Sequence, residues 1–328
     1  MSDTNTPYAG LSPDVILDAL EAHGFRPTGG LLALNSYENR VYQLELEDES
    51  YCVAKFYRPA RWSDAQILEE HAFTHELLEH ELSVVAPWER DGTSLFNHQE
   101  FRFAVFPRQG GHAPNIDISA DLKILARTLG RLHAVGAVRR FAHRPSISVA
   151  RLGTESREFL LGHEFVPAEL VPAYDAITQQ LLEQIVPTFD NVVQQHWARI
   201  HGDCHLGNLL WRNDTPHFVD FDDCVNGPAI QDLWMLLSGE RSDQERQLSE
   251  IMEAYTAFAD FDFSSLRLVE PLRTLRMMHH AAWIGRRWHD PAFPRAFPWY
   301  NTDKYWSEHI LNLREQLALL HEPPLSVR

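Results

Sequence analysis

The sequence predicts an α+β protein with two lobes, a small β-rich N-terminal lobe over residues 1–107 and a larger, mainly helical C-terminal lobe over residues 108–328. Two observations predict this division. Apolar runs of strand length surround one helical pattern in the first third of the chain, whereas later apolar residues recur mostly at helical spacing. Between these parts, the segment PRQGGHAP (107–114) is rich in turn-forming residues, which is typical of a hinge.

The N-terminal lobe is expected to begin with a short helix. Ser12 is a good N-cap, Pro13 suits the first helical position, and Gly24 lies just past the predicted end. The next segments are expected to be strand, strand, helix and strand, in that order: 31–46, 51–59, 63–79 and 101–107. These segments predict a small sheet accompanied by one long helix.

The C-terminal lobe is expected to be built from helices. Ser119 is expected to cap a helix that ends at Gly136 and whose apolar face repeats at helical spacing. Further helical patterns cover 168–197, 242–259, 266–288 and 303–321. No internal repeat is visible in the sequence.

Composition and charge restrict the classes of partner. Hydrophobic residues make up 44% of the 328 residues, which is enough for a well-packed core. The net charge of -17 disfavours nucleic acid as a partner, because phosphate backbones attract basic surfaces. An acidic surface suits a cationic substrate, although it also simply keeps a protein in solution.

Cysteine usage and hydropathy predict the compartment. The three cysteines, Cys52, Cys204 and Cys224, cannot pair evenly and show no framework spacing, which is typical of a reducing compartment. No apolar run approaches the length that spans a membrane. We therefore expect a soluble, cytoplasmic protein with no membrane partner.

The segment HGDCHLGNLLWRNDTPHFVDFDD (201–223) is the most informative part of the chain. It places Asp203, Asn208 and Asp220 around two short apolar strands, which are separated by a tight loop from Asn213 to Pro216. A single aspartate in a polar loop is usually a turn former or a cap. Here the complete pattern HGD-x4-N-x11-D occurs once, between apolar strands, which favours a functional interpretation.

The chemistry of phosphoryl transfer explains this spacing. A phosphoryl group in transfer spreads negative charge over its oxygens, so the site needs cations. Magnesium takes oxygen ligands, which Asn208 and Asp220 can supply. The acceptor hydroxyl needs a carboxylate within hydrogen-bond reach, and Asp203 is the candidate. The segment therefore predicts an ATP- and Mg²⁺-dependent phosphotransfer site.

This segment resembles the catalytic loop of the aminoglycoside phosphotransferase and choline kinase superfamily. Further segments resemble a bacterial serine/threonine protein kinase branch of that superfamily: LNSYENRVYQL (34–44), VAKFYRPARWSDAQILEEH (53–71), DFDDCVNGPAIQDLWMLL (220–237) and DPAFPRAFPW (290–299). The resemblance implies a protein-kinase-like fold and a role in a stress response. It also implies that Asp203 and Asp220 are catalytic, that Asn208 and Asp220 bind the metal, and that Asp232 is a buried acid that stabilises the catalytic loop.

Lys55 is unusual because it lies in the apolar run VAKFY, and an unpaired charge is costly to bury. In kinases such a lysine contacts the α- and β-phosphates of ATP and pairs with a helix glutamate. Glu70, fifteen residues later, is the expected partner, and Glu69 is the alternative. A lysine on an edge strand that faces water is the competing interpretation.

Two further residues are expected at the nucleotide. The loop NSYENR (35–40) has no glycine, yet its backbone N–H groups can still face phosphate. Ser36 within it is a candidate phosphate contact or autophosphorylation site by resemblance, and a plain turn serine otherwise. Phe106 and its neighbours are expected to hold the adenine through the hinge backbone.

Asp222 and Asp223 follow Asp220 so closely that the three carboxylates should repel one another. A metal ion or a basic group would relieve the repulsion, or one or both carboxylates are solvated. The usual D-F-G sequence is here Asp220-Phe221-Asp222. This departure puts in doubt a glycine-dependent activation segment.

Two groups of residues could instead bind zinc by residue type: His71 with His75, and His201 with Cys204 and His205. The first group lacks the glutamate of H-E-x-x-H, and the phosphotransfer interpretation already uses the second group. The aromatic segment 288–306 either covers part of an acceptor site or packs as C-terminal support, and the latter is favoured.

The acceptor class follows from the resemblance, because the residues alone predict only transfer to a hydroxyl. The leading expectation is a kinase that acts on serine or threonine in proteins. The alternative is a kinase of a small molecule such as an amino alcohol or a sugar. A catalytically inactive scaffold is a third possibility, against which the intact Asp203, Asn208 and Asp220 argue.

Overall fold

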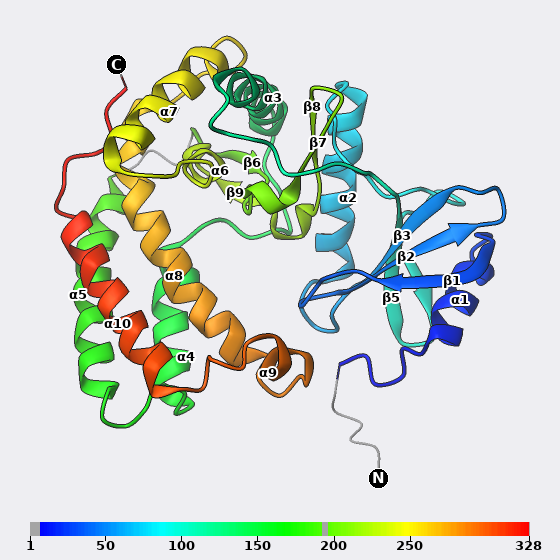
Figure 1. Cartoon of the computed structure of the whole chain (residues 1–328), viewed down its shortest axis with the longest axis horizontal. Coiled ribbons are helices and arrows are strands. Elements are labelled where there is room, and N and C mark those ends of the chain that lie inside the picture. The colour runs from blue at the N-terminus through cyan, green and yellow to red at the C-terminus, as the bar shows by residue number, and fades with distance from the viewer. Residues whose placement is uncertain (1–6, 192–195, 328) are drawn as a thin grey trace. The chain divides into compact units, whose positions relative to one another are not determined.

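The computed structural model describes residues 7–191 and 196–327, which form two compact units. Unit 1 contains the chain up to residue 115 together with 141–144 and 205–224, and unit 2 contains 116–140, 145–204 and 225–328. Unit 1 carries a small antiparallel sheet and unit 2 is mainly helical, so the expected α+β class is confirmed (Figure 1). The lobe boundary at residue 107 stays a prediction.

The sheet of unit 1 has five antiparallel strands in the spatial order β1-β2-β3-β5-β4. The strands are β1 (Pro27–Ala33), β2 (Arg40–Leu46), β3 (Tyr51–Phe56), β4 (Phe96–His98) and β5 (Phe101–Pro107). Lys55 lies on the central strand β3, opposite Val41 on one side and Ala104 on the other. The edge-strand interpretation of this lysine is therefore wrong.

Helix α1 (Pro13–Ala22) begins as predicted, because the Ser12 hydroxyl accepts a hydrogen bond from the Val15 N–H at 3.3 Å. The helix packs its buried face against the core of the sheet. Phe56 and Phe103, whose rings stack with centroids 5.1 Å apart, lie at the centre of that core. Burial of these apolar side chains stabilises the unit that carries the candidate nucleotide residues.

Helix α2 (Asp64–Glu79) confirms the helix predicted over 63–79. Its first turn has a capping box, in which Ser63 and Gln66 each satisfy a backbone N–H of the other. The expected apolar residues Ile67, Phe73 and Leu77 are buried. Glu70 and His71 are buried on the same helix, which requires polar partners.

The strands β7 (Leu209–Arg212) and β8 (Thr215–Phe218) form a hairpin in unit 1. Asn213 and Asp214 both have a positive φ, of 51° and 55°, as a two-residue type I′ turn requires. The loop is thus shorter than the predicted Asn213–Pro216, because Thr215 and Pro216 belong to β8. Phe218 pairs through its backbone with the chain at Ser83 and Val85, within the same unit.

Unit 2 is formed mainly by helices, together with one short strand pair. Its elements are α3 (Ser119–Ala137), the π-helix η1 (Ala150–Thr154), α4 (Glu155–Gly162), α5 (Val171–Asp190), β6 (Ala198–Ile200), β9 (Val225–Gly227), α6 (Ile230–Trp234), α7 (Arg241–Tyr255), the 3-10 helix η5 (Phe263–Leu268), α8 (Val269–Arg286), α9 (Ala292–Ala296) and α10 (Asp303–Leu319). Helix α8 contacts α4, α5, α6 and α10, and α3 contacts α7. None of the helices in the described ranges is long and apolar enough to cross a membrane.

Several predicted helix ends differ from the structure. Ile118 occupies the N-cap position of α3, so the predicted cap at Ser119 is wrong. Gly136 does not end this helix, because it serves close packing instead: an added Cβ would collide with the Arg199 backbone oxygen. The pattern over 168–197 forms α5, while residues 192–195 of that prediction lie outside the described residues.

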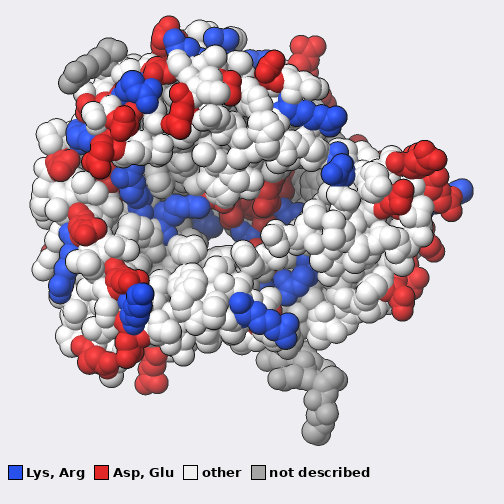
Figure 2. All heavy atoms as spheres, in the orientation of Figure 1, with Lys and Arg blue, Asp and Glu red and all other residues white. Residues whose placement is uncertain are grey.

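The excess negative charge is not evenly spread. Figure 2 shows acidic side chains gathered over the end of unit 1 that carries α1 and the β2–β3 turn, where the sequence ELEDE occupies positions 45–49. Over unit 2 the visible face carries acidic and basic side chains interspersed. The net charge of the chain therefore does not describe the charge at any one site.

Candidate active site

Lys55 is buried and meets three carboxylates of unit 1. Its Nζ lies 3.0 Å from Asp220 Oδ1, 3.2 Å from Asp222 Oδ1 and 3.8 Å from Glu70 Oε1. Burial by itself would lower the pKa of the ammonium, but these carboxylates raise that pKa well above its ordinary value. Lys55 therefore stays positively charged inside the unit.

The two adjacent glutamates of α2 have different partners. Glu70 pairs with Lys55 through one oxygen and with Arg144 Nη2, at 2.7 Å, through the other. Glu69 instead accepts hydrogen bonds from the backbone N–H groups of residues 142, 143 and 144, at 2.6 to 2.8 Å. Glu70, and not Glu69, is thus the glutamate next to Lys55. Burial raises the pKa of Glu70 to about 6, although Lys55 and Arg144 oppose the rise.

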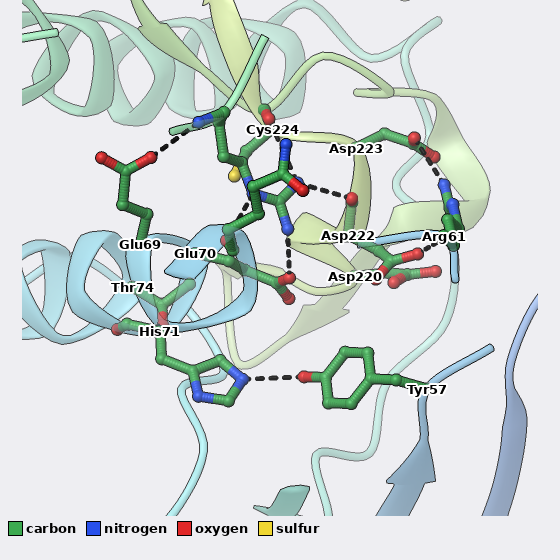
Figure 3. A network of polar contacts seen from close by, with 12 residues as sticks. Tyr57, Arg61, Glu69, Glu70, His71, Thr74, Asp220, Asp222, Asp223 and Cys224 are labelled. Carbon is green, nitrogen blue, oxygen red and sulfur yellow. Dashed lines mark hydrogen bonds and ion pairs between the residues drawn. The ribbon is translucent and has the colours of Figure 1, made fainter. Parts of the chain in front are cut away.

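Asp222 lies at the centre of the network in Figure 3. Its carboxylate pairs with Lys55 and Arg61 and accepts a hydrogen bond from Asn39 Nδ2 at 3.1 Å. Burial would raise the pKa of this carboxyl, but Arg61, Lys55 and Arg144 hold it well below its usual range. Basic side chains therefore relieve the repulsion expected among the carboxylates.

Arg61 and Arg144 are two residues of this network that sequence reasoning missed. Arg61 bridges Asp222 and Asp223, with its Nη2 2.7 Å from Asp223 Oδ1. Arg144 donates to the backbone oxygens of Gln66, at 2.9 Å, and Asp222, at 2.7 Å, and its guanidinium lies 4.7 Å from the centre of the Trp62 ring. Both arginines lie in irregular segments, so neither belongs to a periodic pattern.

The loop 35–40 between β1 and β2 is held to the same network. The Arg58 side chain donates to the Glu38 backbone oxygen at 3.0 Å, and the Arg58 N–H donates to Asn39 Oδ1 at 3.1 Å. Asn39 in turn binds Asp222. Ser36 lies in this loop and is half-buried.

Phe106 is half-buried near the end of β5. It lies two residues beyond Ala104, which pairs with Lys55, so Phe106 and Lys55 are on the same face of the sheet. Its ring meets the His71 ring edge to face at 6.3 Å. The sheet therefore places this predicted adenine contact near the lysine, within unit 1.

Asn208 and Asp220 are brought together at the open end of the β7–β8 hairpin. The N–H of Val219 donates to the Asn208 backbone oxygen at 3.0 Å, and Asp220 is the next residue. Asp220 has left-handed backbone angles, φ 59° and ψ 63°, which Asp tolerates better than most residues with a Cβ. Its side chain is 54% exposed. An accessible carboxylate beside an amide suits a hard cation such as Mg²⁺.

Asp203 belongs to unit 2, in the loop that follows β6. Asp232 is buried below this loop and accepts hydrogen bonds from the N–H groups of His201, at 2.9 Å, and Gly202, at 2.8 Å. His133 Nε2 lies 3.0 Å from the same carboxylate. Asp203 itself pairs with Arg276 of α8, which sequence reasoning also missed, with Nη1 2.6 Å from Oδ1.

The zinc interpretations find no support in the part of the chain that is described. His71 is already bonded to the Tyr57 hydroxyl at 2.7 Å and to the Ser94 hydroxyl at 2.8 Å. Burial lowers the pKa of His71 to about 3, with a contribution from Lys55. Among residues 7–191 and 196–327, no three His, Cys, Asp or Glu side chains form a group that could hold a metal ion.

The aromatic segment 288–306 packs mainly within unit 2, as the favoured interpretation predicted. The buried Tyr300 hydroxyl donates to the Ala281 backbone oxygen at 2.8 Å. Its ring lies 5.1 Å from that of Trp288 and 5.4 Å from that of Trp306. Tyr300 is therefore a structural residue, while Trp299 remains 42% exposed.

Comparisons with known proteins show which family and which relatives the chain resembles. Residues 31–269 match the model of the phosphotransferase enzyme family. Stress response kinase A of Escherichia coli (strain K12) is 44% identical over 333 residues, which cover 100% of this chain and 99% of that protein. A protein of Salmonella typhimurium (strain LT2) named serine/threonine protein kinase RdoA is also 44% identical, with 100% and 99% covered.

Solved structures show the same fold at low sequence identity. The amicoumacin kinase hAmiN, in complex with AMP-PNP and Ca²⁺, has a TM-score of 0.75 at 17% identity and covers 95% of this chain and 94% of that chain. A microcompartment-associated aminopropanol kinase has a TM-score of 0.71 at 19% identity and covers 94% of this chain and 96% of its own. These matches confirm the kinase-like fold that the resemblance implied.

Proposed function

The chain belongs to the phosphotransferase enzyme family, and from that premise we propose that it is an ATP- and Mg²⁺-dependent serine/threonine protein kinase. One observation carries the proposal: buried Lys55 pairs with Glu70 and Asp220, while Asp220 stands beside Asn208. This arrangement provides a cation for phosphates and oxygen ligands for a metal in the same unit.

Unit 1 would hold the nucleotide. Lys55 would bind the α- and β-phosphates, with Glu70 fixing the direction of its side chain. Backbone N–H groups of the loop around Ser36 would face phosphate oxygens, and the backbone near Phe106 would hold the adenine. Magnesium bound by Asn208 and Asp220 would neutralise charge on the phosphates.

Unit 2 would serve the acceptor through Asp203. Its carboxylate would accept the proton of the acceptor hydroxyl as the oxygen bonds to the γ-phosphorus. The bond from that phosphorus to the oxygen that bridges to the β-phosphate breaks at the same time, so ADP leaves. Asp232 would keep the loop of Asp203 in position through the two N–H groups that it accepts.

Serine or threonine in proteins is the acceptor class that the full-length relatives support, since one of them is named a serine/threonine protein kinase. The name stress response kinase A supports a role in a stress response. The three cysteines are free and buried, which suits a reducing compartment such as the cytoplasm.

The test uses purified protein, Mg²⁺ and ATP labelled at the γ-phosphate, with a cell extract separated by size into proteins and metabolites. Label in proteins, or in the enzyme itself, is expected with wild type and not with Asp203→Ala. Label confined to the low-mass fraction would contradict a protein acceptor and indicate a small-molecule kinase. Lys55→Met should weaken binding of ATP, and unchanged affinity would contradict the role of Lys55.

A further inference from the structure

The catalytic loop of this chain contains no residue with a permanent positive charge. The segment HGDCHLGN (201–208) has Gly202 where the protein-kinase sequence H-R-D has an arginine. A cation is supplied from helix α8 instead, because Arg276 Nη1 lies 2.6 Å from Asp203 Oδ1. Both residues belong to unit 2, so this pairing is a property of one compact unit.

Arg276 differs from its neighbour Arg273 on the same helix. Arg273 pairs with Glu270 at 3.0 Å, donates to Gln244 at 3.3 Å and lies over the Trp234 ring. Arg276, by contrast, has a side chain that is 42% exposed although it contacts Asp203. A guanidinium has five N–H donors, so one carboxylate leaves donors for a second anion.

Helix α8 places a histidine one turn beyond Arg276. Local desolvation of the ring and the charge of Arg276 lower the pKa of His280, one turn later on α8, so the neutral ring is favoured near pH 7, although the residue as a whole is exposed. That ring stacks on Trp283 at 5.7 Å and meets Phe297 edge to face at 6.5 Å. Arg276 is therefore a half-buried cation beside Asp203, next to a neutral aromatic ring.

We infer that Arg276 is a specificity-determining residue, whose solvent-facing N–H groups bind an anionic group next to the acceptor hydroxyl. The preferred acceptor is then a serine or threonine that is flanked by aspartate or glutamate. The inference rests on the proposed function, because it takes Asp203 as the residue that meets the hydroxyl. An amine at the same place would be repelled by the guanidinium, which disfavours amino alcohols.

The test compares three peptides that are identical except for the residues that flank one serine, which are aspartate, alanine or lysine. Wild type is expected to give the highest kcat/KM with the aspartate peptide. Arg276→Gln should reduce that preference about tenfold, mainly through KM. A tenfold change is about the size expected for the loss of one hydrogen bond between charged groups. Arg276→Lys should retain part of it. Arg314→Gln, an equal charge change at an exposed position of α10, should leave it unchanged.

A binding measurement separates this inference from the proposed function. The aspartate peptide, labelled and with alanine in place of its serine, should bind wild type more tightly than Arg276→Gln by fluorescence anisotropy, whether or not transfer occurs. Equal binding by the two proteins would overturn the inference. An equal loss of kcat with all three peptides would also overturn it, since Arg276 would then only position Asp203.

Transfer to small molecules alone would contradict the protein acceptor without deciding the role of Arg276. In that case hydroxy acids are compared with amino alcohols on the same variants. A preference for hydroxy acids that disappears in Arg276→Gln would support the inference, and a preference for amino alcohols would overturn it. Thermal unfolding of each variant checks that the fold is retained.

Discussion

Replacement of Asp232 tests whether one buried carboxylate holds the loop of Asp203. The carboxylate is fully buried, and it accepts hydrogen bonds from the backbone N–H groups of His201 and Gly202 through different oxygens. In Asp232→Asn one oxygen becomes an NH2 group, which is a donor. Whichever way the amide is oriented, one of the two backbone N–H groups loses its acceptor. Asp232→Ala removes both acceptors and also the contact with His133.

The expected free-energy cost of each replacement follows from the number of backbone N–H groups that lose their acceptor. One buried N–H without a partner costs about 2 kcal/mol, which corresponds to about 30-fold in the equilibrium for local opening. Asp232→Ala orphans two backbone N–H groups and loses a charged partner of His133, so we expect roughly 5 kcal/mol. The kinase activity of the two variants should fall in the same order, because the loop that carries Asp203 loosens.

Amide hydrogen exchange at His201 and Gly202 measures this opening directly. Exchange there should accelerate by about 30-fold in Asp232→Asn and by more in Asp232→Ala. Asp260→Asn, which changes an exposed aspartate of the same unit, is the matched control. Wild-type exchange at both amides in Asp232→Ala would refute the reasoning, because the carboxylate would then not hold the loop.

Three further changes have defined outcomes. The pKa of His71 is about 3 in the folded protein and 6.5 as its ordinary value, so the neutral form is favoured by folding. The free energy of unfolding that this preference contributes is fully present above pH 6.5 and is lost as the pH falls towards 3, by about 2 kcal/mol at pH 5. In His71→Gln, the free energy of unfolding measured with urea should therefore fall by about 2 kcal/mol less between pH 7 and pH 5. Arg144→Met leaves Glu70 buried without one partner and should lower the free energy of unfolding by about 3–5 kcal/mol. Addition of Glu70→Gln should restore part of that loss. An unchanged free energy of unfolding in Arg144→Met would contradict the network. Asp214→Gly should raise the free energy of unfolding by about 0.5 kcal/mol, because φ is 55° there and glycine adopts a positive φ without strain. A lowered free energy of unfolding would contradict the turn assignment.

Local signals explain why much of unit 1 could be predicted. The caps at Ser12 and Ser63 act within four residues of their own helices, so the sequence around them is sufficient. The start of α3 was predicted wrongly because Ser119 is a good cap by residue type, whereas the chain starts the helix from Ile118 without a side-chain cap. The short elements α6 and α9 have five residues each, too few for a clear helical period.

The residues of the candidate site likewise fall into two groups, those that local sequence signals indicate and those that they do not. Asp203, Asn208 and Asp220 could be proposed from spacing, because metal and hydroxyl chemistry restricts the residue types. Their roles stay predictions. Arg144 and Arg276 could not be proposed from local spacing, because they pair with residues that are far away in the sequence. Arg144, for example, is 74 positions from Glu70. Ion pairs between residues so far apart in the sequence leave no periodic pattern, so they are recognised only in the folded structure.

The discontinuity of unit 1 has a consequence for how the protein is made. Lys55 and Glu70 are synthesised early, but Arg144 and Asp222 leave the ribosome much later. At roughly 5–20 residues per second, the interval from residue 70 to residue 222 lasts between about 8 and 30 s. During that time Lys55 on the sheet and Glu70 on α2 can pair with each other, but Lys55 still lacks Asp220 and Asp222, which are made last. A nascent chain that stops before the β7–β8 hairpin therefore lacks part of unit 1, and completion of this unit must wait until late in translation.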